Sequence, residues 1–453
     1  MKRIKLKQFF KRHIGATILL VILLVFPMCI SNQARLNMRV VVTGIAIDKA
    51  DDKYMVTAQI VKTSPGSESP GSSAQIDFIT DSAKTIAEAV NNLSYKAGKV
   101  SAFSHTSFVI VGDEAAKEDV TDILDYFVRD KILKSSALVL FADGKASDEI
   151  KKTKEMELSV GIGLQKVYLY KERDSDGLMV TVLEFLNKSR TCSKTSLASI
   201  LSLSSNDEQQ KQAEGGSGGG ESSSGSGVGG ESSSSSEESS SSGSSGGSSG
   251  GSSSSGGSSG GGSSGGESEN NKQNFETHAP IAIFVDGKFK GKLEGEDEVL
   301  GYMYANSGSK TFLISLEDID CDCEEDGGTV KVSIQVKSKN NKTNIRFENE
   351  IPCFDMTIKI NNAEIIEVIS GTVHTKFTDK EYEKIKQEIE KKISERISKC
   401  FEKSREMKAD VLCAYNRARK FNNKELTKYY SSSDEFIEKV KLNVKVEVGQ
   451  LEY

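Results

Sequence analysis

Short runs rich in β-branched residues alternate along the chain with segments in which apolar residues recur at helical spacing. Residues 39–48 and 54–62 are two such runs on either side of a polar turn, which predicts an antiparallel pair of strands. Further strands are predicted over residues 106–111 and 137–141. Two helices are predicted from apolar stripes, which consist of Ile86, Ala89, Val90 and Leu93 and of Val120, Ile123, Leu124 and Phe127. The pattern is typical of a mixed α and β domain whose sheet is covered by helices.

The last part of the chain predicts another sheet with helices. Half-buried strands are predicted where apolar and polar residues alternate, over residues 330–336, 354–360 and 440–446. Thr378 and Glu381 form a capping box that opens a helix, and a second helix is predicted over residues 409–420. The stripe of the first helix consists of Tyr382, Ile385, Ile389, Ile393, Ile397 and Phe401. This stripe is either core against the sheet or a groove for a partner. We expect an antiparallel sheet packed against long C-terminal helices.

Between these parts, residues 205–274 consist almost entirely of Ser and Gly with occasional Glu. Such a tract cannot bury enough apolar surface to offset its backbone entropy, so we expect it to be disordered. Strand-like residues lie on both sides, at 197–203 and 280–293, and the latter reads as a hairpin around Asp286 and Gly287. The tract is therefore either a linker between domains or a long loop between two paired strands.

The N-terminus carries a basic stretch followed by an uncharged apolar block at residues 14–30. The block would form a helix of about 25 Å, near the lower limit for crossing a bilayer. Three interpretations remain: an uncleaved anchor, a lipid attached to Cys29, or an ordinary cleaved signal. In all three, the charge order places the rest of the chain outside the cytoplasm. The basic residues are Lys2, Arg3, Lys5, Lys7, Lys11 and Arg12.

Charge and cysteine content exclude two further properties, nucleic-acid binding and a disulfide framework. Without the leader, 53 Lys and Arg face 65 Asp and Glu, so this part is acidic and has no basic run. Because nucleic-acid binding requires a basic face, no nucleic-acid partner is predicted. The cysteines are odd in number and scattered, which is not the pattern of a disulfide framework. They are Cys29, Cys192, Cys321, Cys323, Cys353, Cys400 and Cys413.

No motif in the chain indicates catalysis. His13, His105, His278 and His374 lie apart from one another and from cysteines at ligand spacing, and His105 reads as a surface or strand-end residue. No phosphate-binding loop or nucleophile elbow is present in the sequence. We therefore predict a protein that is not an enzyme and has no cofactor.

One acidic cluster raises a metal hypothesis. It comprises Asp318, Asp320, Asp322, Glu324 and Asp326, ahead of Gly327 and Gly328. An EF-hand loop starting at Asp322 has Gly327 at its sixth position, but Ser333 replaces the carboxylate required at the twelfth. Cys321 and Cys323 are too close together for a zinc knuckle. We therefore interpret the cluster as a solvated acidic loop and predict no metal site.

Four segments together resemble the Ger(x)C family of spore germination proteins, the C subunits of germinant receptors. They read RLNMRVVVTGIAIDK, SHTSFVIVGDEAAKE, DILDYFVRDKILKSSALVLFADGKASDEI and APIAIFVDGKFKGKLEGEDE. The resemblance implies a three-domain α+β protein without known enzymatic activity, on the outer face of the inner spore membrane beside integral-membrane receptor subunits. It also implies a lipid on Cys29, which precedes Leu36 and Asn37 at nearly the family's distance. Finally, it implies that the tract interrupts the middle domain.

We accordingly predict a segment order of leader (1–30), N-terminal α+β domain (31–185), small middle domain (186–326, interrupted at 205–274) and C-terminal α+β domain (327–453). The predicted function is that of a non-catalytic, membrane-anchored receptor subunit needed for nutrient-triggered germination through protein contacts. The alternative is a surface-anchored ligand-binding or cell-envelope adhesion protein in which the tract is a flexible stalk.

Overall fold

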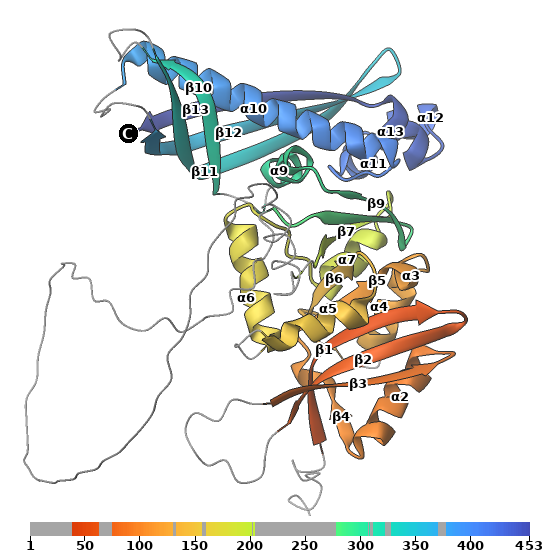
Figure 1. The fold of residues 1–453 in the computed structure, drawn as a ribbon. Coiled ribbons are helices and arrows are strands. Elements are labelled where there is room, and N and C mark those ends of the chain that lie inside the picture. Colours follow the sequence, from red (N-terminus) through yellow and green to blue (C-terminus); the bar gives the residue numbers. More distant parts are fainter. Residues whose placement is uncertain are drawn as a thin grey trace, which may run out of the picture. The chain divides into compact units, whose positions relative to one another are not determined.

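The computed structural model of the chain contains two β-sheets with their covering helices (Figure 1). The leader with Cys29, the Ser/Gly tract, His13, His374 and residues 322–327 of the acidic cluster lie outside the described residues, so their predictions stay predictions. No helix in the described part is both long enough and apolar enough to span a bilayer. The structure describes residues 39–62, 75–129, 133–155, 160–201, 203, 278–306, 308, 311–321, 328–369 and 377–453.

The first sheet has nine strands in the order β3-β2-β1-β5-β6-β7-β8-β9, with β4 beside β1. The predicted antiparallel pair β1 and β2 is confirmed, with Ile45 opposite Ala58. Strands β1, β5, β6 and β7 run parallel, and the two ends of the sheet are antiparallel. The bounds are β1 Arg39–Ala50, β2 Lys53–Lys62, β3 Gln75–Ala83, β4 Val100–Ala102, β5 Phe108–Gly112, β6 Leu138–Ala142, β7 Thr195–Ile200, β8 Ile281–Val285 and β9 Lys288–Leu293.

Helices connect the parallel strands of this sheet, as parallel pairing requires. Both predicted stripes are confirmed, because all their residues are buried on α2 and α4. His105 is exposed at the end of a short 3-10 helix, in agreement with its interpretation as a surface residue. The bounds are α2 Ile86–Ala97, η2 Phe103–His105, α3 Asp113–Ala116, α4 Val120–Arg129, α5 Ala146–Lys152, η3 Thr153–Glu155, α6 Val160–Arg173 and α7 Val182–Ser189.

The strands on either side of the Ser/Gly tract are neighbours. β7 pairs with β8 in antiparallel register, with Ser199 opposite Ile281, which confirms the interpretation of the tract as a loop between paired strands. The hairpin β8–β9 is also confirmed, and Asp286 and Gly287 both have positive φ, as its tight turn requires. These strands continue the first sheet, and the predicted boundary at residue 185 falls inside α7.

The second sheet has the order β10-β11-β12-β13 and corrects one expectation. β10, β11 and β12 are antiparallel, but β13 runs parallel to β12, with Val444 opposite Met356. The prediction of a purely antiparallel sheet was therefore wrong. The reason is the long helical connection between these strands, which returns the chain to the starting end of β12. The bounds are β10 Phe312–Cys321, β11 Gly328–Glu348, β12 Ile351–Ile369 and β13 Lys441–Glu452.

The C-terminal helices differ in length. The capping box of α10 is confirmed: Thr378 accepts from the backbone N–H of Glu381, whose carboxylate accepts from that of Thr378. The stripe of α10 is core, because all its residues except the partly buried Tyr382 are buried with the second sheet. The predicted start of the next helix at residue 409 was wrong: α11 begins at Ala414, after Cys413 with φ 60°. The bounds are α9 Glu296–Ala305, α10 Asp379–Glu406, α11 Ala414–Phe421, α12 Asn423–Tyr429 and α13 Ser433–Lys439.

A polar cleft around helix α9

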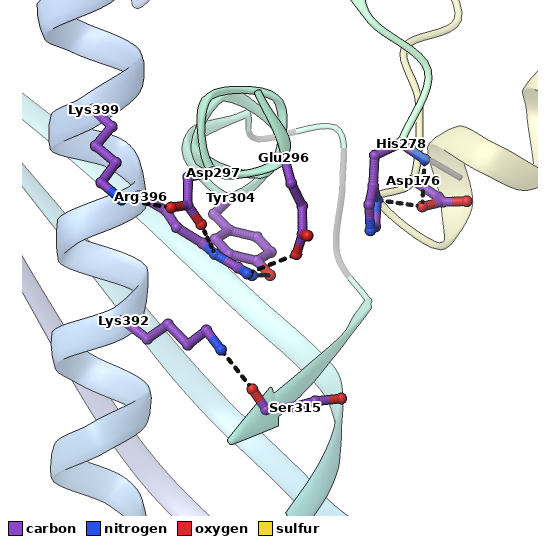
Figure 2. Close-up of polar contacts among 9 residues, drawn as sticks. All are labelled: Asp176, His278, Glu296, Asp297, Tyr304, Ser315, Lys392, Arg396 and Lys399. Atoms are coloured by element: carbon purple, nitrogen blue, oxygen red, sulfur yellow. Dashed lines mark hydrogen bonds and ion pairs between the residues drawn. The ribbon is translucent and has the colours of Figure 1, made fainter. Parts of the chain in front are cut away.

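Helix α9 connects the last strand of the first sheet to the first strand of the second. A cleft of about 990 Å³ lies beside it, lined by the loop after α6, by α9, by β10 and by α10. Figure 2 shows the charged side chains of this cleft, with Glu296 and Asp297 facing Arg396. These contacts hold the first turn of α9.

The centre of the cleft is Arg396 on α10, which is only 7% exposed. Its Nε donates to Asp297 Oδ1 at 2.8 Å, its Nη2 to Glu296 Oε1 at 2.9 Å and its Nη1 to the Tyr304 hydroxyl at 3.0 Å. Burial disfavours the charged form of Arg396. The interactions with Tyr304 and Asp297 are stronger than this effect and raise the pKa of the guanidinium. The arginine is therefore a charged bridge between α10 and both ends of α9.

The first turn of α9 carries carboxylates that pair with cations of α10. Glu296, Asp297 and Glu298 lie in its first turn, where carboxylates are favoured by the helix dipole. Glu298 Oε2 also accepts from the backbone N–H of Gly295 at 3.3 Å. Lys399 Nζ lies 2.5 Å from Asp297 Oδ2, and together with Arg396 it lowers the pKa of that carboxyl. The first turn therefore stays negatively charged.

The middle of α9 lies directly against α10. A Cβ atom at Gly301 would lie 2.1 Å from the backbone oxygen of Arg396 and 3.0 Å from Cys400 Cβ. Only glycine allows the two helix backbones to approach this closely. The contact places Arg396 within reach of the acidic first turn.

The other end of α9 is held from the second sheet. Lys339 Nζ, on β11, donates to the carbonyl oxygens of Met303, Tyr304 and Asn306 at 3.2, 2.5 and 2.8 Å. Asn341 Nδ2 donates to Tyr304 O at 3.1 Å and to Ala305 O at 2.8 Å. These donors satisfy carbonyls that the helix itself leaves without partners. Burial lowers the pKa of Lys339 to about 7.

The titration of Lys339 should appear in the pH dependence of stability. Its pKa in the fold, about 7, lies below the ordinary value of 10.5, so the unfolded chain binds more protons between these values. The contribution of Lys339 to the free energy of unfolding therefore rises with pH in this window and falls as the pH drops. Relative to Lys339→Met, we expect wild type to gain up to about 1.4 kcal/mol per pH unit. Urea unfolding of both proteins between about pH 7 and about pH 9 measures this difference, and parallel profiles would contradict it.

On the opposite wall of the cleft, the loop after α6 contacts two other segments. One contains His278, before the β8–β9 hairpin, and the other contains Thr311, before β10. His278 Nδ1 lies 2.6 Å from Asp176 Oδ1 (Figure 2), and although burial disfavours the charge of Asp176, His278 lowers the pKa of that carboxyl. Ser175 Oγ donates to Thr311 O at 2.7 Å, and Thr311 Oγ1 donates to Arg173 O at 2.6 Å. The loop therefore contacts both His278, shortly before β8, and the residue before β10.

The chemistry of this cleft is that of a binding or structural surface. Lys392 Nζ donates to Ser315 O at 2.7 Å, and burial together with Arg396 lowers its pKa. Burial raises the pKa of the Cys400 thiol to about 12, which keeps it protonated. In the described part of the chain, no three His, Cys, Asp or Glu residues gather as metal ligands.

Sequence reasoning did not identify the residues of this cleft. It assigned no role to His278, and it named neither Arg396 nor Asp297. One signal was available: Arg396 lies seven residues after Ile389 and three after Ile393, which places a charge on the buried face of α10. A charge at such a position requires a partner, but the pattern does not say which one. Cys192, Cys353, Cys400 and Cys413 are free thiols.

Comparison with known proteins places this architecture among spore germination proteins. Residues 32–203 match the family described as "Spore germination protein N-terminal domain", and residues 280–449 match "Spore germination B3/ GerAC like, C-terminal". Spore germination protein B3 of Bacillus subtilis (strain 168) is 33% identical over 109 residues, 23% of this chain and 28% of that protein. The putative spore germination protein YfkR of the same organism is 30% identical over 135 residues, 28% of this chain and 34% of that protein. These matches thus span about a third or less of each curated relative.

A solved structure, that of the GerBC protein, is similar with a TM-score of 0.44 and 17% identity, covering 90% of this chain and 96% of that one. The two family matches lie on either side of the Ser/Gly tract and together cover most of the chain. They confirm the resemblance found in the sequence. The chain belongs to the Ger(x)C family of spore germination proteins.

Proposed function

We propose that this chain is a non-catalytic, membrane-anchored subunit of a spore germinant receptor, needed for nutrient-triggered germination. It acts through contacts with integral-membrane receptor subunits on the outer face of the inner spore membrane. The observation that carries the proposal is the family match on both sides of the tract, over residues 32–203 and 280–449. The leader, with its basic stretch before an apolar block, supplies the anchor, either as an uncleaved helix or through a lipid on Cys29.

The ion pairs of the polar cleft have a structural role. Arg396, Lys399, Glu296 and Asp297 are bonded to one another across α9 and α10, so they stabilise the relative placement of these helices. Charged groups that satisfy one another in this way hold a surface in shape without providing a free acid or base. This is what a subunit working through protein contacts requires.

The adhesion alternative is less well supported. A stalk separates independently folded parts, but β7 and β8 on either side of the tract are paired strands of one sheet. A long insertion between paired strands adds only a slowly growing closure entropy, so the sheet can tolerate it. The pairing therefore favours the receptor subunit.

Deletion of the encoding gene tests the proposal. We expect mutant spores to lose germination in response to specific nutrients while responding normally to a trigger that bypasses the receptors. Expression of the full chain should restore the nutrient response, and expression of a chain lacking residues 1–30 should not, because it has no anchor. Germination is measured as the loss of optical density of a spore suspension. Mutant spores that respond normally to every nutrient tested would contradict the proposal.

A further inference from the structure

The turn between α2 and β4, residues 95–100, presents apolar side chains to solvent. Tyr95 is 81% exposed and Val100 is 62% exposed. Helix α2 ends here because Gly98 adopts φ 60° and its N–H bonds to the carbonyl oxygen of Tyr95. We call this segment the α2–β4 tip.

Hydrogen bonds and an ion pair hold the tip in place. Ser94 Oγ donates to Ser101 Oγ at 3.1 Å and accepts from the backbone N–H of Ser101 at 3.3 Å. Lys96 Nζ lies 3.0 Å from Asp81 Oδ2 and also donates to Thr80 O. The exposed tyrosine and valine are therefore held outward by contacts on both sides of the turn.

The tip is also cationic, although the body of the protein is acidic. Lys99 is exposed within the tip, and Arg39 is exposed on β1 directly opposite Val100. Neither side chain forms an ion pair with a residue in the described stretches of the chain. An exposed tyrosine beside exposed lysine and arginine is the composition of protein surfaces that lie at a membrane interface, where anionic lipid attracts the cations.

Only a short stretch of chain separates this surface from the apolar block of the leader. The apolar block ends at residue 30 and β1 begins at Arg39, so only residues 31–38 separate them. Fully extended, this stretch reaches roughly 30 Å. β4 pairs in parallel with the first residues of β1, which places the tip beside Arg39 at the start of β1 (Figure 1).

We propose that the α2–β4 tip docks on the surface of an anionic phospholipid bilayer, with Tyr95 and Val100 in the interface and Lys99 and Arg39 facing the phosphates. The inference rests on the membrane anchoring given under the proposed function. The tip is a second attachment beside the leader, and two attachments bind together more strongly than either alone. It restricts rotation of the body about its anchor.

The absence of tryptophan from the sequence allows a direct test. The full chain carrying Tyr95→Trp is reconstituted in vesicles of phosphatidylglycerol and brominated phosphatidylcholine. We expect its fluorescence to shift to shorter wavelength and to lose most of its intensity by contact with bromine. The matched control is Phe421→Trp, because Phe421 is 61% exposed at the end of α11 and Arg417 and Lys420 lie 5.0 and 5.1 Å from the centroid of its ring. Its tryptophan should be quenched far less.

Flotation of the vesicles distinguishes loss of tip docking from loss of anchoring. If the protein floats but the tryptophan of Tyr95→Trp is quenched no more than that of Phe421→Trp, docking of the tip is overturned while the anchor stands. If the protein does not float, the proposed anchoring fails and the docking fails with it. Adding Arg39→Glu and Lys99→Glu to Tyr95→Trp should reduce the quenching without changing flotation. Unchanged quenching would refute the role of these cations and with it the proposal.

Discussion

Replacing Gly301 with alanine is expected to lower the free energy of unfolding by about 3 kcal/mol. The added Cβ would lie 2.1 Å from the backbone oxygen and 2.6 Å from the backbone carbon of Arg396. Backbone atoms of α10 cannot rotate away as a side chain can, so the two helices must move apart. That movement also lengthens the bonds from Arg396 to Glu296 and Asp297, which adds to the loss.

Gly295→Ala is the matched control for Gly301→Ala. Gly295 precedes the same helix with φ −69°, and the nearest atom to an added Cβ is 3.4 Å away on the flexible side chain of Glu298. Because Gly295 is the N-cap of α9, we expect this variant to lose about 1 kcal/mol or less, well below the loss for Gly301→Ala. Urea unfolding followed by circular dichroism measures both variants. Equal midpoints for the two would show that α9 and α10 do not pack as closely as the structure indicates.

The Arg396→Met variant is expected to lose about 3 kcal/mol of stability. Methionine fills much of the same space but removes the three donated hydrogen bonds to Glu296, Asp297 and Tyr304. Asp297 retains Lys399, whereas Glu296 and the buried Tyr304 hydroxyl lose the partners described above. Because Arg396 is nearly buried, water does not replace these bonds fully.

Lys399→Met provides the comparison for the arginine. Lys399 also binds Asp297, but its side chain is 60% exposed, so its removal should cost less than about 1 kcal/mol. The same urea unfolding measurement applies, with added salt as a second variable. Salt should diminish the effect of Lys399→Met more than that of Arg396→Met, because exposed charges are screened more strongly. An Arg396→Met protein as stable as Lys399→Met would rule out the buried bridge.

Predictions that depend on neighbouring residues in the sequence were the accurate ones. The stripes of α2 and α4, the capping box at Thr378 and the hairpin at Asp286 all follow from periods or turn residues within a few positions. Predictions that depend on distant residues were less complete. The parallel direction of β13 was missed for this reason. The start of α11 at Ala414 was also missed, although its cause is local: the buried Asp410, just before the helix, accepts from the backbone N–H groups of Tyr415 and Asn416.

The polar cleft also depends on residues that are distant in the sequence. Arg396 and Glu296 are a hundred residues apart along the chain, and no local pattern pairs them. The position of Arg396 on a buried face indicated that some partner exists, because an unpaired buried charge is strongly disfavoured. The identity of that partner depends on how α9 packs on α10, which in turn depends on a single glycine.

The amino-acid sequence alone identified part of the strands and helices with their buried faces, the charged leader and the family, since these rest on local periodicity, composition and the order of segments. The tertiary structure decided that the strands around the Ser/Gly tract close one sheet, that β13 runs parallel to β12, and that charges from separate helices meet at α9. The physical reason is that pairing between distant segments is governed by three-dimensional packing and by the partners that buried charges require, and neither is written in the spacing of neighbouring residues.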